Sequence, residues 1–344
     1  MTNKLIDFSE NNKILEVKNL KTYFYTDDGI VKAVDGVSFD LKVGETLGIV
    51  GETGCGKSVT ALSILGLIPK PRGKIIEGEI IFSGKNLLKM SAREMQNFRG
   101  NRISMIFQDP MTSLNPVYTV GNQVMESIIA HRKMSKKDIK KESLRLLEMV
   151  GIPEPRRRFN SYPHEFSGGM SQRVMIAMAI ANSPSILIAD EPTTALDVTI
   201  QAQILELMDE LKEKTKSSII IITHDLGVVA KYAARVMVMY AGKPVEFSNV
   251  DNIFYKPLHP YTIGLMKSIT RLDEEKRESL KPIEGSPPSL IDLPEGCTFR
   301  IRCKFAVERC KKTFPPLIEI EKEHYVSCYR ASDFLEGILE RFNN

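Results

Sequence analysis

The chain has 344 residues, of which 42% are hydrophobic and 26% charged, a composition typical of a globular protein and not of a disordered or fibrous one. A formal net charge of +4 is too small for a protein whose main task is to neutralise nucleic-acid phosphates, so we expect no nucleic-acid partner. The length predicts one large domain followed by an extension.

The five cysteines are unevenly distributed: Cys55 stands alone, and four lie close to the C-terminus. Residues 1–10 contain no apolar segment of the kind that a secretory signal requires. The longest apolar stretches, such as 59–68, fall short of the roughly 20 residues that cross a bilayer. We therefore expect a cytosolic protein without a membrane helix, in which clustered cysteines bind a metal more often than they form disulfides.

The first half of the chain changes from strand-like to helix-like patterns. Apolar residues predict strands within 14–17, 37–41 and 46–50, and the last of these runs into a glycine-rich turn followed by a helix over 59–66. Charged segments of helical period between residues 90 and 151 predict a helical insertion. Within it, Ser135 followed by Asp138 indicates the start of a helix that continues to residue 150.

Apolar strand patterns return in the second half, at residues 186–189, 219–222 and 236–239, and a long helical pattern covers 198–214. Continuous apolar runs that alternate with helices predict an α/β fold with a parallel sheet covered on both faces. After residue 249 the chain becomes proline-rich, which predicts a linker and an appended cysteine module.

The glycine-rich turn fits the pattern G-x-x-x-x-G-K-[ST] and lies between a predicted strand and a predicted helix, as a phosphate-binding loop requires. Backbone N–H groups of such a loop surround the β-phosphate of ATP, Lys57 would reach the β- and γ-phosphates, and Ser58 would bind Mg²⁺. A plain glycine turn at a helix start is the weaker alternative. The expected ATP contacts are Gly51, Glu52, Thr53, Gly54, Cys55, Gly56, Lys57, Ser58 and Val59.

A pair of acidic residues, Asp190 and Glu191, follows the apolar run at 186–189. An acid at the end of a buried strand is placed to bind the magnesium of a nucleotide complex, and the second acid could orient the attacking water. Alone, the pair could equally be two solvated acids. Together with the phosphate loop it predicts a nucleotide-hydrolysing site.

Residues 14–250 resemble the ATP-binding subunits of ABC transporters in several motifs that occur in the expected order. Residues 166–172, FSGGMSQ, are similar to the LSGGQ signature, although Phe166 and Met170 replace its leucine and glutamine. Gln108 resembles the Q-loop glutamine, residues 195–197 the D-loop, and His224 the switch histidine. The resemblance implies an ABC-type P-loop NTPase domain over 1–250, with a RecA-like core, a β-subdomain and a helical subdomain at about 96–178, followed by an extension over 251–344.

The same resemblance implies a role for each matched residue. Glu191 would polarise the attacking water, Gln108 would contact Mg²⁺ and link the site to the helical subdomain, and His224 would sense the γ-phosphate. An aromatic residue about 33 positions before Lys57 would stack on adenine. Phe24 falls there and Tyr25 is second. In a head-to-tail dimer, ATP bound to one subunit would also contact Ser167, Gly168, Gly169 and Asp197 of the other.

Four segments of the sequence resemble peptide importers in particular, and among these the D-type ATPase of dipeptide or oligopeptide permeases. They are residues 108–116, 166–177, 191–203 and 258–262. This resemblance implies ATP-driven peptide import at the cytoplasmic face of the membrane, with an F-type ATPase as dimer partner, two transmembrane permease subunits and, indirectly, a solute-binding protein. A homodimer is chemically allowed. Importers of nickel or another solute remain an alternative, as does an iron–sulfur assembly ATPase of another class.

The four C-terminal cysteines are separated by five, six and seventeen residues, which matches neither the C-x-x-C pairs of structural zinc nor the bacterial ferredoxin run. From spacing alone zinc is favoured over iron–sulfur, and His324 could replace one cysteine. The D-type resemblance reverses this order, because members of that group carry a C-terminal [4Fe-4S] cluster. It implies a cluster site at about 295–330 with the ligands Cys297, Cys303, Cys310 and Cys328, and zinc is the alternative metal. Cys55 is excluded because it lies in the phosphate loop, far away in the sequence.

Overall fold

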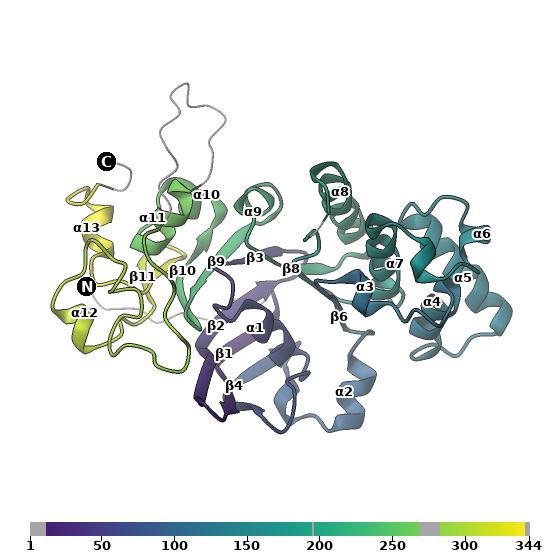
Figure 1. Ribbon diagram of the computed structural model, residues 1–344, viewed down its shortest axis with the longest axis horizontal. Helices are drawn as coiled ribbons and strands as arrows, with labels where there is room; N and C mark the ends of the chain where they lie inside the picture. Colours follow the sequence, from purple (N-terminus) through teal and green to yellow (C-terminus); the bar gives the residue numbers. More distant parts are fainter. Residues whose placement is uncertain (1–11, 195, 269–282, 341–344) are drawn as a thin grey trace. The chain divides into compact units, whose positions relative to one another are not determined.

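The computed structural model describes residues 12–194, 196–268 and 283–340, and divides the chain into two compact units (Figure 1). Ala195 of the predicted D-loop and the first ten residues, where we expect no signal sequence, lie outside the described residues. Unit 1 consists of Met1–Leu41, Leu47–Asn86 and His224–Asn344, and unit 2 of Lys42–Thr46 and Leu87–Thr223. Within the described ranges, no helix has both the length and the apolar character to span a bilayer.

Unit 1 contains an antiparallel sheet in the order β2-β1-β4-β5. In β1 the side chains of Leu15, Val17 and Leu20 are fully buried, as expected for a strand with one face toward a core. Both strands predicted from residues 14–17 and 37–41 are confirmed but are longer than expected. The strands are β1 (Lys13–Thr26), β2 (Gly29–Lys42), β4 (Gly73–Phe82) and β5 (Lys85–Asn86).

A second run of strands in unit 1 has the order β11-β12-β10-β9-β3, in which β3 and β9 are parallel and the other pairs antiparallel. Its strands are β3 (Thr46–Val50), β9 (Arg235–Tyr240), β10 (Lys243–Asn249), β11 (Ile318–Glu321) and β12 (His324–Val326). The helices of this unit are α1 (Lys57–Ile64), α9 (Leu226–Tyr232), α10 (Val250–Tyr255), α11 (Pro260–Lys267), α12 (Arg309–Lys312) and α13 (Ala331–Leu335).

The C-terminal extension is tied to this sheet by strand pairing and by a buried carboxylate. Tyr325 of β12 lies opposite Phe247 of β10, so the pairing crosses the boundary predicted at residue 250. Glu246 is fully buried and accepts hydrogen bonds from the Leu258 and His259 N–H groups and from His324 Nε2. Three donors satisfy this carboxylate, which would otherwise be costly to bury. The start of the extension also contains the helices α10 and α11, where we predicted a linker.

Unit 2 contains three parallel strands in the order β8-β7-β6, and α4, α5 and α7 pack on one another beside them (Figure 1). The strands are β6 (Ile103–Ile106), β7 (Ile186–Asp190) and β8 (Ser218–Thr223). The helices are α2 (Ala92–Phe98), α3 (Pro110–Ser113), α4 (Val120–Ile129), α5 (Lys136–Met149), α6 (Pro155–Arg158), α7 (Gly168–Ile180) and α8 (Val198–Thr215), with short 3₁₀ turns at Leu87–Lys89 and Pro163–Glu165.

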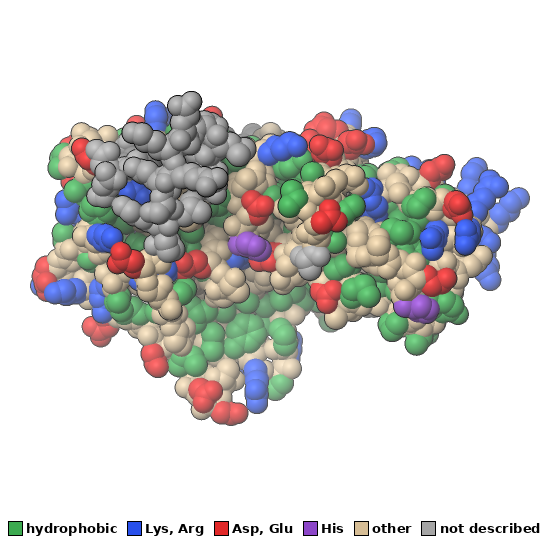
Figure 2. Space-filling model, turned by 45° about the horizontal axis from the view of Figure 1, so that its top comes forward, with side chains coloured by type: hydrophobic (Ala, Val, Ile, Leu, Met, Phe, Trp, Pro, Cys, Tyr) green, Lys and Arg blue, Asp and Glu red, His purple; other side chains and the backbone are tan. Residues whose placement is uncertain are grey.

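The segment predicted as a helical insertion is interrupted by a strand. Ile103 of β6 pairs with Ile186 of β7, so this short run is buried in the sheet. The helix predicted from Ser135 onward is confirmed, because Ser135 Oγ accepts the Asp138 N–H at 3.2 Å and caps α5. Figure 2 shows Lys and Arg side chains gathered where α5 and α6 lie, as expected for solvated helix faces.

Candidate functional site

The predicted phosphate loop connects β3 to α1 in unit 1. Gly56 has a φ of 103°, and a Cβ at this position would lie 2.1 Å from the carbonyl oxygen of Ala33, so the loop requires glycine there. Lys57 Nζ donates hydrogen bonds to the carbonyl oxygens of Gly51 at 2.8 Å and Glu52 at 3.1 Å. Burial raises the pKa of Cys55, so this thiol carries no negative charge in the loop at neutral pH. The strand, turn and helix predicted around the motif are confirmed.

The predicted catalytic carboxylate and the Q-loop glutamine meet within unit 2. Asp190 is the last residue of β7 and is buried, and Glu191 directly after it has a φ of 46°. The Glu191 N–H donates to the carbonyl oxygen of Ile222 in β8, which fixes the turn. Glu191 Oε2 accepts hydrogen bonds from Gln108 Nε2 at 3.1 Å and from Thr194 Oγ1 at 2.8 Å. The carboxylate is thus oriented by two side chains and by its own backbone.

The signature-like segment forms the start of α7, also in unit 2. Ser167 is exposed and caps the helix by accepting the Met170 N–H at 3.4 Å. A Cβ at Gly169 would lie 2.7 Å from Ile200 Cγ2 of α8, so close helix packing requires the glycine. Phe166 is 7% exposed under the guanidinium of Arg158, which explains why an aromatic residue can replace the usual leucine.

Each unit carries part of the predicted nucleotide site. Unit 1 holds Phe24, Tyr25, the phosphate loop over residues 51–59 and His224. Unit 2 holds Gln108, Ser167, Gly168, Gly169, Asp190, Glu191 and Asp197, and Asp197 Oδ1 caps α8 by accepting the Ile200 N–H. Of the predicted site residues in unit 2, Gln108 and Glu191 are joined by a direct side-chain hydrogen bond.

The three aromatic residues at the end of β1 differ in what they contact. Tyr23 Oη donates to Asp35 Oδ1 at 2.7 Å, so this ring is held within the sheet. Phe24 packs on Gly73 of β4, where a Cβ would lie 2.8 Å from its Cε1 atom. Tyr25 is 41% exposed and has Lys74 Nζ 5.2 Å from its ring centre. Of the two adenine-stacking candidates, Tyr25 has the more exposed ring.

The Tyr23–Asp35 contact belongs to a cluster that predicts how stability depends on pH. Burial alone would raise the pKa of Asp35, but Lys243, whose Nζ lies 2.6 Å from Asp35 Oδ2, and Tyr23 outweigh burial and lower it. A carboxyl whose pKa is lower in the folded than in the unfolded state stabilises the fold above its ordinary pKa of about 3.9. This contribution is lost as the pH falls through the lowered folded pKa.

We expect Asp35→Asn to lower the free energy of unfolding by about 1 kcal/mol at pH 7 and to flatten its decline in acid. Urea unfolding at pH 7 and at pH 3 measures both effects. Asp28→Asn, an exposed residue in the turn between β1 and β2, is the matched control and should behave as the parent protein does. Equal acid sensitivity of the parent and Asp35→Asn would contradict this role of Asp35.

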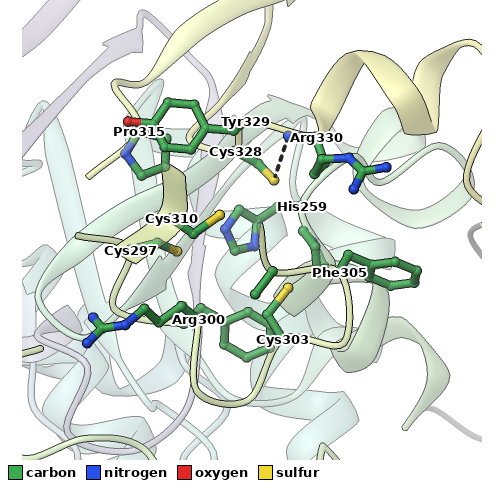
Figure 3. A pocket seen from close by; sticks show the side chains of 13 residues that line it. His259, Cys297, Arg300, Cys303, Phe305, Cys310, Pro315, Cys328, Tyr329 and Arg330 are labelled. Atoms are coloured by element: carbon green, nitrogen blue, oxygen red, sulfur yellow. Dashed lines mark hydrogen bonds between the residues drawn. The ribbon is translucent and has the colours of Figure 1, made fainter. Parts of the chain in front are cut away.

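The four C-terminal cysteines line one cavity in unit 1 (Figure 3). Cys297 and Cys303 come from the loop before α12, Cys310 lies in α12, and Cys328 follows β12. The four form no disulfide, and His259 lies among them in the view. The cavity volume is about 10 Å³, room for one water molecule. Cysteines separated by up to 31 positions in the chain therefore line one small cavity.

Crowding and burial disfavour ionised thiols in this cavity. Burial raises the pKa of Cys303 to about 11 and that of Cys328 to about 12, and the neighbouring cysteines add to both shifts. Among the described residues, no three His, Cys, Asp or Glu side chains are arranged to hold a metal ion. His324, the possible replacement ligand, is bonded to Glu246 at 2.7 Å and is not among the residues that line the cavity.

The sequence did not reveal that the extension contacts the phosphate loop. Arg302 forms a two-fold ion pair with Glu52, and Tyr261 Oη accepts the Glu52 N–H. These partners lie more than 200 positions apart in the chain, and no local pattern signals such a contact.

Comparison with known proteins defines the class to which this fold and these motifs belong. Residues 34–194 match the family model "ABC transporter", and residues 245–310 match "Oligopeptide/dipeptide transporter, C-terminal region". A solved dimeric structure of the ATP-binding cassette MJ0796, in a post-hydrolysis state bound to ADP and Pi, is 30% identical with a TM-score of 0.62, over 69% of this chain and 98% of that chain. The chain belongs to the ABC transporter family, and the predicted P-loop fold is confirmed.

The relatives place the chain more narrowly within that family. The dipeptide transport ATP-binding protein DppD of Bacillus subtilis is 55% identical over 92% of this chain and 94% of its own length. The probable peptide ABC transporter ATP-binding protein y4tR of Sinorhizobium fredii is 52% identical over 93% of this chain and 96% of its own. Within the family, the chain belongs with the ATP-binding proteins of oligopeptide and dipeptide transporters, and this predicted resemblance is confirmed.

Proposed function

We propose that this chain is the ATP-hydrolysing subunit that powers the import of dipeptides or oligopeptides through an ABC transporter. The observation that carries this function is the joint presence of both family regions, one with a complete set of nucleotide motifs and one specific to peptide transporters. The second region and the names of the relatives favour peptides over nickel, and transport over iron–sulfur assembly. The direct experiment is peptide uptake by the reconstituted complex, which must depend on ATP hydrolysis by this chain.

The chemistry follows from the residues that the two units present. The phosphate loop and the Lys57 ammonium would bind the phosphates of ATP, and the oxygens of Ser58, Gln108 and Asp190 are the hard ligands that Mg²⁺ prefers. When bound, Mg²⁺ neutralises charge on the phosphates. Glu191 would accept a proton from the attacking water, since Thr194 and Gln108 fix the direction of its carboxylate. His224, exposed after β8, would contact the γ-phosphate.

A complete site also needs residues from a second ATPase subunit. The exposed start of α7, with Ser167 and Gly168, offers a hydroxyl and backbone N–H groups at a helix N-terminus, where anions bind. A similar solved structure is dimeric and bound to ADP and Pi, which supports pairing of two such subunits. We propose a head-to-tail pair in which this segment faces the other subunit's ATP. We propose an F-type ATPase as the natural partner. A homodimer of this chain is the other arrangement that a complex purified from cells could reveal.

An exposed apolar segment supports docking on the membrane subunits. Phe107, Met111, Val117 and Tyr118 follow or lie close to Gln108 in unit 2 and are 41 to 71% exposed. Large apolar side chains exposed within one short segment mark interaction surfaces. We propose that this segment contacts the two transmembrane permease subunits, which would hold the chain at the cytoplasmic face of the membrane and connect it indirectly with a solute-binding protein.

The four cysteines are the basis of a finer proposal, a [4Fe-4S] cluster held by Cys297, Cys303, Cys310 and Cys328, for which their loops would have to move apart, because the cavity has room for one water molecule. Four free thiols around one cavity are the donor set of such a cluster, and a bound cation would offset the unfavourable ionisation of buried thiols. Each of the four cysteines would supply one thiolate. A zinc ion bound by the same four thiolates is the competing arrangement.

We expect protein purified without oxygen to contain about four iron and four sulfide per chain. Replacing any of the four cysteines by serine should lower the iron content several-fold, because each thiolate is needed as a ligand. Cys55→Ser is the matched control, since Cys55 is also a buried free cysteine but lies in the phosphate loop, and the iron content of this variant should be that of the parent. Elemental analysis measures the result, and zinc without iron or sulfide would contradict the cluster.

A further inference from the structure

The phosphate loop of unit 1 is held from outside by the C-terminal extension, and Glu52 is the point of contact. The Glu52 carboxylate receives both ends of the Arg302 guanidinium, with Nη1 2.7 Å from Oε2 and Nη2 2.9 Å from Oε1. The Glu52 N–H donates to Tyr261 Oη at 2.8 Å. Both the side chain and the backbone of this loop residue are therefore bound by residues that lie after position 250.

Arg302 is itself fixed by its surroundings. Its Nε donates to the carbonyl oxygen of Glu284 at 3.0 Å and its Nη2 to that of Ile283 at 3.2 Å. The guanidinium lies 5.8 Å from the Tyr240 ring centre and 5.9 Å from that of Phe299. Its side chain is 5% exposed, compared with 26% for Glu52. A bidentate, stacked arginine with all its nitrogens engaged is a rigid support, which a lysine could not reproduce.

The extension also borders the loop on a second side. A cavity of about 360 Å³ lies between Thr53 and Gly54 of the loop and the segment from Pro287 to Leu290. The carbonyl oxygen of Leu290 accepts the Lys32 N–H of β2 at 3.1 Å, which anchors that segment to the sheet. The extension thus borders the phosphate loop on two sides, with residues that the nucleotide motifs do not include.

The charge of Glu52 explains what this contact does. A carboxylate in a loop that binds a triphosphate opposes binding, because like charges a few ångströms apart repel strongly where water is partly excluded. We propose that Arg302 is a positioning residue of the nucleotide site, which neutralises Glu52 and fixes the phosphate loop, so that the C-terminal extension controls ATP affinity. This inference rests on the proposed function, since it requires that the loop binds ATP.

The test is a double-mutant cycle on the affinity for MgATP. Arg302→Met leaves Glu52 as an uncompensated charge and should raise the Kd about tenfold or more. In the Glu52→Gln background, Arg302→Met should change the Kd by less than about threefold, because the charge that Arg302 neutralises is then absent. Arg302→Lys should fall between the parent and Arg302→Met. If Glu52→Gln restores the ATP affinity of the Arg302→Met protein, Arg302 acts by neutralising the charge of Glu52. General damage to the fold would instead persist in the double variant.

Arg235 offers the matched control in the same unit. It forms a buried pair with Asp40, with Nη2 2.9 Å from Oδ2, and its guanidinium lies 5.0 Å from the centre of the Phe247 ring, so these two partners lie outside the phosphate loop. Arg235→Met should lower the thermal stability and leave the ATP Kd unchanged. An unchanged Kd in Arg302→Met, or no rescue in the double variant, overturns the role of Arg302. Failure of the parent protein to bind ATP would instead overturn the proposed function.

Discussion

Replacing Glu191 by glutamine should slow ATP hydrolysis by about 10²–10⁴-fold while ATP still binds. The glutamine has nearly the same shape, and its oxygen can still accept the Thr194 hydroxyl, which lies 2.8 Å from the carboxylate. The backbone N–H bond to Ile222 is also kept. The substitution therefore removes the base and leaves the turn in place. Single-turnover hydrolysis and equilibrium ATP binding, measured on the same preparation, separate the two effects.

Glu210→Gln is the matched control for this experiment. Glu210 lies on α8 in the same unit and pairs with Lys214 on the surface at 3.0 Å, so the same change of charge occurs without contact with the site. Its hydrolysis rate should equal that of the parent protein. A near-normal rate for Glu191→Gln, assayed with the partner subunit, would show that another group activates the water.

Replacing Lys57 by methionine should raise the Kd for ATP by about 100-fold or more, because the loop loses its only positive side chain and with it a charge-assisted contact to the phosphates. Lys57 is 5% exposed, and its ammonium is directed into the loop by the carbonyl oxygens of Gly51 and Glu52. Methionine keeps the length of the side chain and fits a buried position. Fluorescence titration with a labelled ATP analogue measures the loss.

Lys21→Met controls for the removal of a lysine elsewhere in unit 1. Lys21 pairs with Glu77 at the surface, 2.6 Å apart, and its loss should leave the ATP Kd unchanged. Thermal melting of both variants should show folded protein. If Lys57→Met bound ATP as tightly as Lys21→Met does, the assignment of residues 51–59 as the phosphate site would be wrong.

The elements that the sequence revealed best are those whose side chains are uniformly apolar. The runs that became β3, β7, β8 and β9 are continuous in apolar residues because both faces of these strands are buried, and their prediction is confirmed. Strand β10 was missed because it buries Glu246 and Ser248 beside Phe247, and the donors that make the burial of Glu246 favourable, from Leu258, His259 and His324, lie later in the chain. Strand β6 was missed because it is short and lies within charged helical sequence.

In the site, too, features formed by consecutive residues could be predicted from the sequence, and contacts between residues far apart in the chain could not. The phosphate loop could be found because its glycines and Lys57 follow one another in a fixed local pattern, and the turn of Gly56 depends on backbone conformation alone. The separate roles expected of Gln108 and Glu191 followed from the family resemblance, and the hydrogen bond between the two side chains was not predicted. The contact of Arg302 with Glu52 could not be predicted, because it depends on how the extension folds back over the loop.

The central claim is that ATP hydrolysis by this chain drives peptide uptake. Its most direct test is transport of a labelled dipeptide or oligopeptide, supplied with its binding protein, into vesicles that contain the purified transporter with this subunit and MgATP on the nucleotide side. We predict uptake with the parent subunit and a loss of uptake with Glu191→Gln that matches its loss of hydrolysis. Undiminished uptake with the glutamine variant, or ATP hydrolysis by the parent complex without any peptide uptake, would contradict the account.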